Sequence, residues 1–186
     1  MGGLLLSLWA PILLSAVAVF IASSLIHMVL GYHKHDYAAI PSEDAVMETL
    51  RKFNIPRGDY MVPHPGDREH MKSAEYDEKL KKGPAFSMTV MSGEFAMGKL
   101  FGQWFAYTLA MSAFAAFLAI HMVAPGASFR RVFHVVGLTT FASYGLALWP
   151  ISIWYQRKWS TTLRANLDAL IFAILTGAVF GWLWPR

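Results

Sequence analysis

Hydrophobic and polar positions divide the chain into four long apolar runs and one polar stretch. From Leu4 to Leu30 there is no Asp, Glu, Lys or Arg, and this run is longer than the ~20 residues that a helix needs to cross a bilayer. Three further runs have the same character, and the turn "APGAS" separates the second run from the third. The predicted spans cover residues 4–30, 100–123, 132–153 and 163–184. The pattern therefore predicts an all-α membrane protein with four transmembrane helices.

The polar stretch, residues 31–99, is expected to be an insertion of about 70 residues between the first two helices. Ser42 is predicted to cap an amphipathic helix with two acidic residues in its first turn. A second helix is predicted in "REHMKSAEYDEKLKKGP", where Gly and Pro mark the stop. Between them, "PRGDYMVPHPGD" is predicted as turn and loop. After the second helix, "FSMTVMSG" is predicted as a short strand without an obvious partner. We expect one membrane domain over residues 1–186, with the insertion folded back as interfacial helices.

Composition supports the bilayer as the solvent of this chain, since 55% of its residues are hydrophobic and only 15% are charged. There is no cysteine, which excludes a disulfide scaffold, thiolate metal sites and cysteine nucleophiles. The net charge is +4 and the pI is near 9.4, but Lys and Arg lie mostly beside the apolar runs, as membrane-flanking residues do. We therefore expect the lipid bilayer, and no nucleic acid, as a partner.

The distribution of Lys and Arg also predicts an orientation. These residues are more numerous in 31–99 and in the loop "QRKWSTTLR" than on the opposite face, which has Arg130, Arg131 and Arg186. The positive-inside rule then puts residues 31–99 in the cytoplasm and both termini on the periplasmic side. No eukaryotic targeting signal is evident, so a bacterial cytoplasmic membrane is the expected location.

Three segments of the chain carry a resemblance to known proteins. On "RGDYMVP", "KKGPAFSMTV" and "LDALIFAILTGAVFGWLWP", the chain resembles uncharacterised bacterial four-span integral membrane proteins. The resemblance covers most of the chain and rests on turn and membrane residues. It implies the architecture alone, and it assigns no catalytic or binding residue.

Three histidines lie where the first apolar run gives way to charge, in "IHMVLGYHKHDY". Gly31 is predicted to end the helix in the left-handed conformation, which leaves His27 in the last turn and His33 and His35 in the following loop. Two imidazoles at this spacing can bind one metal ion, with His27 or Asp36 as a third ligand. The alternative is an interfacial cluster that contacts water and lipid headgroups.

His121 and His134 lie at similar depths on either side of the turn "APGASFRR". Facing each other across a helical hairpin, they could bind a metal ion or ligate a haem axially, with Arg130 and Arg131 near any anionic group. The alternative is that each imidazole bonds to a nearby backbone carbonyl, Ser or Thr. The spacing alone does not decide between these interpretations.

Asp168 is the one acid inside the predicted spans, and a carboxylate in a membrane is costly. Arg164 lies one helical turn nearer the interface and Asn166 is adjacent, so a satisfied Arg164–Asp168 pair is one interpretation. The other is a carboxylate that faces a cavity, opposite His27 at similar depth, where it accepts a proton or binds a ligand.

The fourth apolar run also carries a small residue every four positions: Ala165, Ala169, Ala173, Gly177 and Gly181. Such a ladder lets two helix backbones approach closely in lipid. It is expected to serve either packing inside the bundle, with the alanine-rich second span as the neighbour, or association with a membrane protein partner or a second copy.

Two function classes follow from these features. The leading expectation is a structural or accessory component of a membrane assembly, without enzymatic activity. The alternative is a small metal- or haem-binding redox or transport protein that uses the intramembrane histidines. Lipid-modifying chemistry at Asp168 and His27 is a third interpretation, but the sequence has no Walker loop, HExxH or GxSxG motif to support an enzyme.

Overall fold

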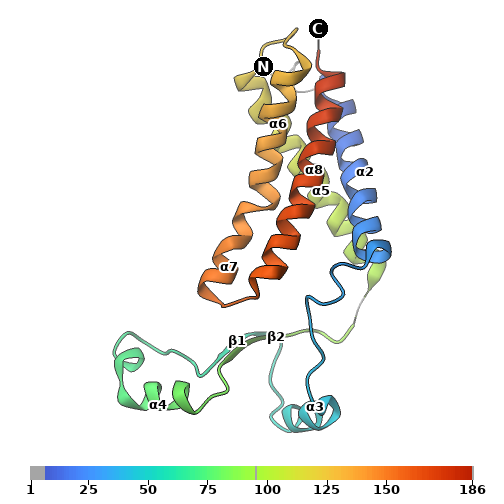
Figure 1. Cartoon of the computed structure of the whole chain (residues 1–186). Coiled ribbons are helices and arrows are strands. Elements are labelled where there is room, and N and C mark those ends of the chain that lie inside the picture. The colour runs from blue at the N-terminus through green and yellow to red at the C-terminus, as the bar shows by residue number, and fades with distance from the viewer. Residues whose placement is uncertain (1–6, 95, 186) are drawn as a thin grey trace. The chain divides into compact units, whose positions relative to one another are not determined.

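The computed structural model describes residues 7–94 and 96–185, and the chain divides into two compact units (Figure 1). One unit is formed by Met1–Ala38 together with Met97–Arg186, and the other by Ala39–Ala96. A single domain over residues 1–186 was expected from the sequence, whereas the contacts within the chain separate these two units. Residues 4–6 of the first predicted span lie outside the described residues.

The first unit is helical. Its described elements are α2 (Trp9–Leu25), the π-helix η1 (Ile26–Leu30), α5 (Met97–Met122), α6 (Phe129–Tyr144), the 3₁₀ helix η3 (Leu146–Leu148), α7 (Trp149–Trp154) and α8 (Trp159–Leu183). Four stretches of the described residues are long and apolar enough to cross a membrane: Trp9–Leu30, Met97–Met122, Phe129–Trp154 and Trp159–Leu183. The chain is therefore mostly helical and has four helices compatible with a membrane protein, as the hydrophobic pattern predicts.

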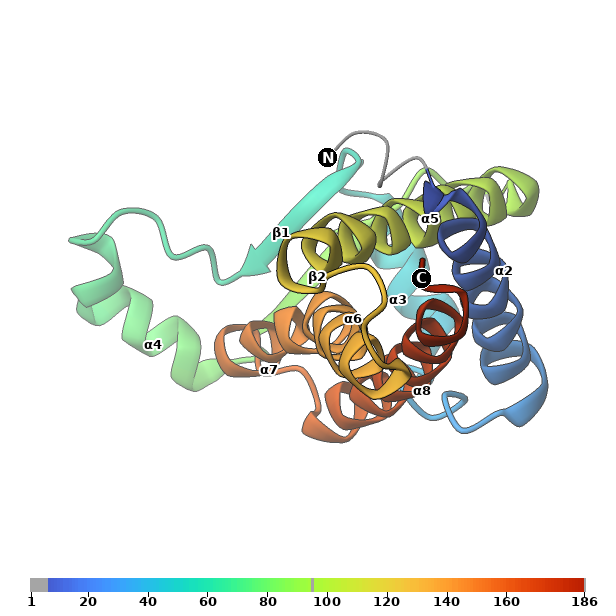
Figure 2. The same cartoon turned by 90° about the horizontal axis from the view of Figure 1, so that it is seen from above.

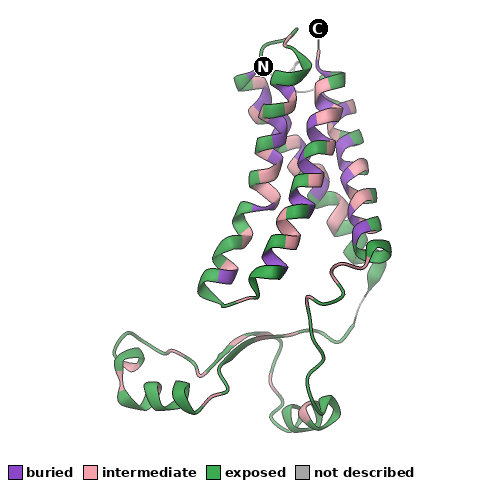
Figure 3. Ribbon diagram, viewed as in Figure 1, coloured by how far each residue is buried: buried purple, intermediate pink, exposed green. Residues whose placement is uncertain are grey.

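The four spanning stretches pack as a closed ring of neighbours. α2 packs against α5 and α8, and α6 packs against the same two helices on the other side (Figure 2). Buried residues lie on the faces that meet, and the outer faces are exposed (Figure 3). Large apolar side chains such as Leu14, Ile21 and Phe117 are among the exposed ones. Exposure of such an apolar surface to water is unfavourable, whereas contact with lipid hydrocarbon is not.

The small-residue ladder of α8 packs against α6. A Cβ atom at Gly177 would lie 2.9 Å from the carbonyl oxygen of Phe133, and one at Gly181 would lie 2.6 Å from Cδ2 of Phe129. Ala169 and Ala173 are buried on the same helix. The expected neighbour, the alanine-rich second span, is not the one observed, because α6 of the third span occupies this face. The ladder therefore serves close packing inside the bundle.

The third predicted span, 132–153, is interrupted in the structure. α6 ends at Tyr144, and η3 connects it to α7, which has Pro150 in its first turn. Proline has no N–H to donate, and its ring collides with the carbonyl four residues earlier, so a regular helix cannot run through this point. The sequence located Pro150 but placed it near the end of an unbroken helix.

The second unit contains strands as well as helices. Its elements are α3 (Glu43–Arg51), β1 (Gly58–Val62), the 3₁₀ helix η2 (His70–Lys72), α4 (Ala74–Lys82) and β2 (Phe86–Val90). β1 and β2 form a two-stranded antiparallel sheet with Gly58 opposite Val90 and Val62 opposite Phe86. The expected all-α fold is therefore wrong in this unit. The partner of the predicted strand is "GDYMV". This segment was predicted as turn and loop because glycine, aspartate and proline, present here as Gly58, Asp59 and Pro63, are typical of turns.

The expected insertion of about 70 residues, 31–99, is also not supported with those limits. Residues up to Ala38 belong to the helical unit, and α5 already begins at Met97. Ser42 precedes α3 as expected, but it has a φ of 53° and its side chain makes no capping hydrogen bond. The cap of α4 is better formed, since the Ser73 side chain accepts a hydrogen bond from the Tyr76 N–H at 3.2 Å.

Candidate metal centre

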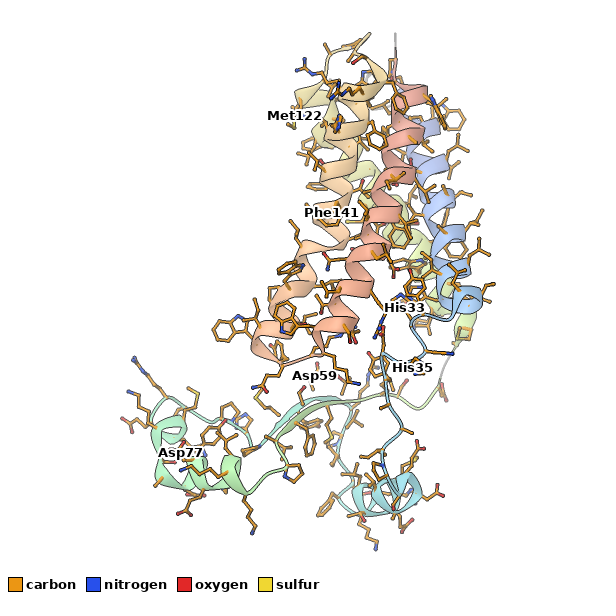
Figure 4. The ribbon with its side chains drawn as sticks, viewed as in Figure 1. His33, His35, Asp59, Asp77, Met122 and Phe141 are labelled. Carbon is orange, nitrogen blue, oxygen red and sulfur yellow. The ribbon has the colours of Figure 1, made fainter. Side chains whose placement is uncertain are left out.

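The site begins with a sharp turn at the end of the first span. The π-helix η1 carries His27, and Gly31 follows it with a φ of 64°, which confirms the predicted left-handed helix end. Residues 31–36 then form two consecutive turns, closed by the Lys34 N–H to the Gly31 carbonyl at 3.2 Å and the Asp36 N–H to the His33 carbonyl at 2.9 Å. These turns fold the chain back, so that His33 lies beside α8 (Figure 4).

Three side chains from separate elements converge at this end of the bundle. One ligand atom from each of His27, His33 and Asp168 lies within 4.8 Å of the others. Within the described residues, these are the histidine and carboxylate side chains that lie close enough together to hold one metal ion. The two imidazoles stack with their ring centroids 4.5 Å apart and their planes 7° from parallel. His27 Nδ1 lies 2.9 Å from the Ser23 carbonyl oxygen, so Nε2 is the ring atom through which His27 would bind an ion. The structure thus brings His27 and Asp168 together, as one interpretation of the sequence proposed.

His33 connects two carboxylates. Its Nδ1 atom lies 2.7 Å from Oδ2 of Asp36, and its Nε2 atom lies 2.9 Å from Oδ2 of Asp168. The contact between Nδ1 and Asp36 is a hydrogen bond. The contact between Nε2 and Asp168 does not have hydrogen-bond geometry, so the buried Nε2 atom has no hydrogen-bond partner among the described residues. With Nδ1–H donating to Asp36, Nε2 carries a lone pair that points to one side of the nearby Asp168 oxygen rather than straight at it. A positive charge beside both atoms, a proton on the imidazole or a bound cation, stabilises two electron-rich atoms at this distance.

Asp168 is buried, with 7% of its side chain exposed. Its Oδ1 atom accepts a hydrogen bond from the Tyr32 hydroxyl. Burial of Tyr32, together with this hydrogen bond and the adjacent negative charge, raises the pKa of the Tyr32 hydroxyl above its ordinary value, so that it stays protonated and donates. Sequence reasoning missed Tyr32. The one available signal was its position directly after the helix-ending Gly31.

Arg164 pairs with Asp36 rather than with Asp168. Its Nε and Nη2 atoms both lie 2.8 Å from Oδ1 of Asp36. Burial raises the pKa of the Asp36 carboxyl, but hydrogen bonds from His33 and Arg164 outweigh it and hold that pKa below its usual value. The expected Arg164–Asp168 pair is therefore wrong. The turn after Gly31 brings in a second carboxylate that the guanidinium reaches instead.

We expect Arg164→Met to lower the free energy of unfolding by about 1–3 kcal/mol, because it leaves the Asp36 carboxylate buried without its cation. The estimate lies below that for a fully buried pair, since 28% of the Arg164 side chain is exposed. Thermal unfolding in a mild detergent measures the effect. Adding Asp36→Asn to Arg164→Met should recover part of the loss, and equal stability of Arg164→Met and the unaltered protein would contradict this account of the pair.

The remaining predicted ligands lie elsewhere. The His35 side chain is exposed in the loop, away from the converging group. His121 Nδ1 lies 2.7 Å from the Phe117 carbonyl oxygen, and His134 Nδ1 lies 2.7 Å from the Arg130 carbonyl oxygen. Each hairpin imidazole is thus bonded one turn back along its own helix, which is the arrangement weighed against a metal or haem site. Both of these side chains are exposed.

No protein-family model matches the chain, and no curated protein or solved structure matches it either.

The converging group has the features of a divalent metal site. Metal–nitrogen and metal–oxygen bonds of about 2.0–2.2 Å place neighbouring ligand atoms roughly 2.8–3.5 Å apart, and the His33–Asp168 separation of 2.9 Å falls in that range. His27 has to move closer and turn out of its stack on His33 to complete the set, because the three ligand atoms spread over up to 4.8 Å and each imidazole binds an ion in its own ring plane. Two imidazoles and one carboxylate suit Zn²⁺ or Fe²⁺ and leave coordination positions open, as catalytic rather than structural sites do.

Proposed function

We propose that this chain is an integral membrane protein that binds one divalent transition-metal ion through His27, His33 and Asp168. One observation carries the proposal: the buried Nε2 atom of His33 faces Oδ2 of Asp168 at 2.9 Å without a hydrogen bond. A metal ion beside both atoms supplies the positive charge that this contact lacks. This assigns the chain to the metal-binding class that the sequence left as the alternative, with His27 and His33 of the predicted interfacial cluster in place of His121 and His134.

The surroundings of the three ligands support the same proposal. Metal-bound histidines usually donate their second ring N–H to a carbonyl or a carboxylate, which fixes the ring and the tautomer. His27 has the Ser23 carbonyl in that position, and His33 has Asp36, which Arg164 holds in turn. Asp168 has the Tyr32 hydroxyl on its other oxygen. Every proposed ligand is thus oriented by a partner that does not contact the ion.

The location is part of the proposal. Four apolar helices support insertion in a bilayer, and the setting that we propose is a bacterial cytoplasmic membrane. The positive-inside rule supports a cytoplasmic unit Ala39–Ala96 and termini on the periplasmic side. The metal centre, near the end of η1, then lies close to the cytoplasmic interface.

Equilibrium dialysis against Zn²⁺ or Co²⁺, followed by elemental analysis, tests the proposal on the full chain in mild detergent. We expect one bound ion per chain. His33→Ala should weaken binding at least about tenfold because it removes one ligand. His35→Ala is the matched control, since it removes an exposed histidine two residues away, and it should bind the ion like the unaltered chain.

A double variant, His121→Ala with His134→Ala, separates this site from the hairpin histidines. It should keep its full complement of metal. The proposal fails if the unaltered chain takes up no stoichiometric ion, or if the ion is lost in the hairpin variant and retained in His33→Ala.

A structural or accessory role in a membrane assembly is the second candidate. It is favoured by the unit Ala39–Ala96, which exposes large apolar side chains such as Met47 and Phe53. Association through the ladder of α8 has less support, because Gly177 and Gly181 already pack against α6. A chain that copurifies with other membrane proteins and holds no stoichiometric metal would favour this candidate.

A further inference from the structure

A cavity of about 590 Å³ lies beside the proposed metal centre. It is open rather than enclosed, and its volume is in the range of small-molecule binding sites. Most of its lining is apolar and comes from α5, η3, α6 and α8, whereas His27, Gln103 and Asp168 form its polar part. Because its walls belong to the helices that are apolar enough to span a membrane, a ligand dissolved in the bilayer is one that can reach it.

The apolar walls are a continuous set of aromatic rings. Trp104 stacks on Tyr107 with ring centroids 5.4 Å apart, and Tyr107 meets Tyr144 edge to face at 5.5 Å. Tyr144 in turn meets Phe172 at 5.3 Å. Trp104 is fixed from behind, since its Nε1–H donates to the Ser23 hydroxyl at 2.7 Å. The walls are thus held in place before any ligand arrives, which lowers the entropy cost of binding.

The polar part of the cavity coincides with two of the three proposed metal ligands. His27 and Asp168 line the cavity, whereas His33 does not. An ion held by all three therefore has its open coordination positions on the cavity side. The charge of Asp36 is already balanced by Arg164, so a dication beside the single carboxylate of Asp168 leaves one net positive charge. A site of this kind selects an anion with oxygen donors.

We propose that the cavity takes a single-chain anionic amphiphile from the bilayer. Its carboxylate or phosphate head binds the ion on His27, His33 and Asp168, and its chain lies against the aromatic rings of Trp104 and Phe172. This inference rests on the proposed metal binding and adds the class of ligand. The net positive charge at the ion favours an anionic head group. The apolar walls formed by the spanning helices favour a hydrocarbon chain.

The test uses Co²⁺, which accepts the same nitrogen and oxygen ligands as Zn²⁺ and has a visible absorption that changes when a new ligand binds. Co²⁺-loaded protein in an uncharged detergent is titrated with dodecanoate, dodecyl phosphate, acetate and dodecanol. We expect dodecanoate or dodecyl phosphate to change the spectrum at concentrations at least about tenfold lower than acetate, because the chain adds buried apolar area. Dodecanol should leave the spectrum unchanged. The more effective of the two anions identifies the head.

Ala165→Phe fills part of the cavity, which Ala165 lines. It should retain Co²⁺ and lose the tenfold advantage of the long chain, and Leu148→Trp, from η3, should do the same. Ala110→Phe is the matched control, because it makes the same change at an exposed position of α5, and it should keep the advantage. An advantage that persists in both filled variants would come from the detergent micelle and would overturn the inference.

The two proposals fail in different ways. If the unaltered chain binds no Co²⁺, the metal centre itself is wrong. If it binds Co²⁺ and responds equally to acetate and dodecanoate, the metal centre stands and the amphiphile is wrong.

Discussion

Asp168→Asn is expected to weaken divalent metal binding at least about 100-fold, or ~2.8 kcal/mol. The change removes the one anionic ligand of the proposed centre and keeps the shape of the side chain. The amide oxygen still accepts the hydrogen bond that the Tyr32 hydroxyl donates to Asp168. The fold should therefore survive, and metal affinity measured by dialysis should carry almost the whole effect.

Asp59→Asn is the matched control for this prediction. Asp59 lies on β1 in the unit Ala39–Ala96, where its Oδ1 accepts a hydrogen bond from Thr89 at 2.6 Å. The same acid-to-amide change there should leave metal affinity unaltered. If Asp168→Asn binds the ion as tightly as the unaltered chain, and its helix content is unchanged, Asp168 is not a ligand.

Gly177→Ala is expected to destabilise the helical unit by about 1–3 kcal/mol through overpacking. The added Cβ would lie 2.9 Å from the Phe133 carbonyl oxygen, a backbone atom that cannot rotate away, so α6 and α8 have to separate. The sign of the effect is informative, because alanine is otherwise the better helix former by about 1 kcal/mol.

Gly102→Ala provides the opposite case on α5. A Cβ atom at Gly102 has no neighbour within 4 Å, so alanine there should be neutral or stabilising by up to about 1 kcal/mol. Unfolding of both variants in the same detergent measures the difference. If the free energy of unfolding changes equally in the two variants, helix propensity alone determines the effect and the close contact at Gly177 contributes nothing to it.

The long-range structure of the spans follows from local information. Continuous apolar runs predict the four helices because hydrocarbon leaves the backbone no partner other than itself. Gly31 marks the end of the first span for an equally local reason, since glycine adopts the left-handed conformation without strain. Boundaries differ by a few residues, and the interruption before α7 shows that one proline can break a run whose hydropathy is continuous.

The candidate site depends on contacts that sequence spacing does not encode. Tyr32 and Asp168 are 136 residues apart, and Asp36 and Arg164 are 128 residues apart. Arg164 precedes Asp168 by one helical turn, so local reasoning paired them. The pairing with Asp36 wins because the turn after Gly31 brings a second carboxylate to the same place. The register between the first and fourth spans decides the outcome, and it is set by packing in three dimensions.

The same limit explains two of the errors outside the site. β1 has a partner far along the chain, whereas its own residues Gly58 and Asp59 are typical of turns. The ladder of α8 was correctly identified as a packing face, but its neighbour depends on the order of helices around the bundle. That order places α6 beside Gly177 and leaves α5 on the far side of the ring.

The neighbouring positions of α2 and α8 in the bundle impose an order on biogenesis. Residues 27–36 leave the ribosome long before Arg164 and Asp168 are made, so Asp36 is synthesised with its His33 partner but without the cation of Arg164. The carboxylate gains its cation only when the last helix inserts. A nascent chain that stops before α8 therefore keeps the Asp36 carboxylate without the Arg164 guanidinium. Quality-control proteases that recognise unpaired polar groups can remove such a chain.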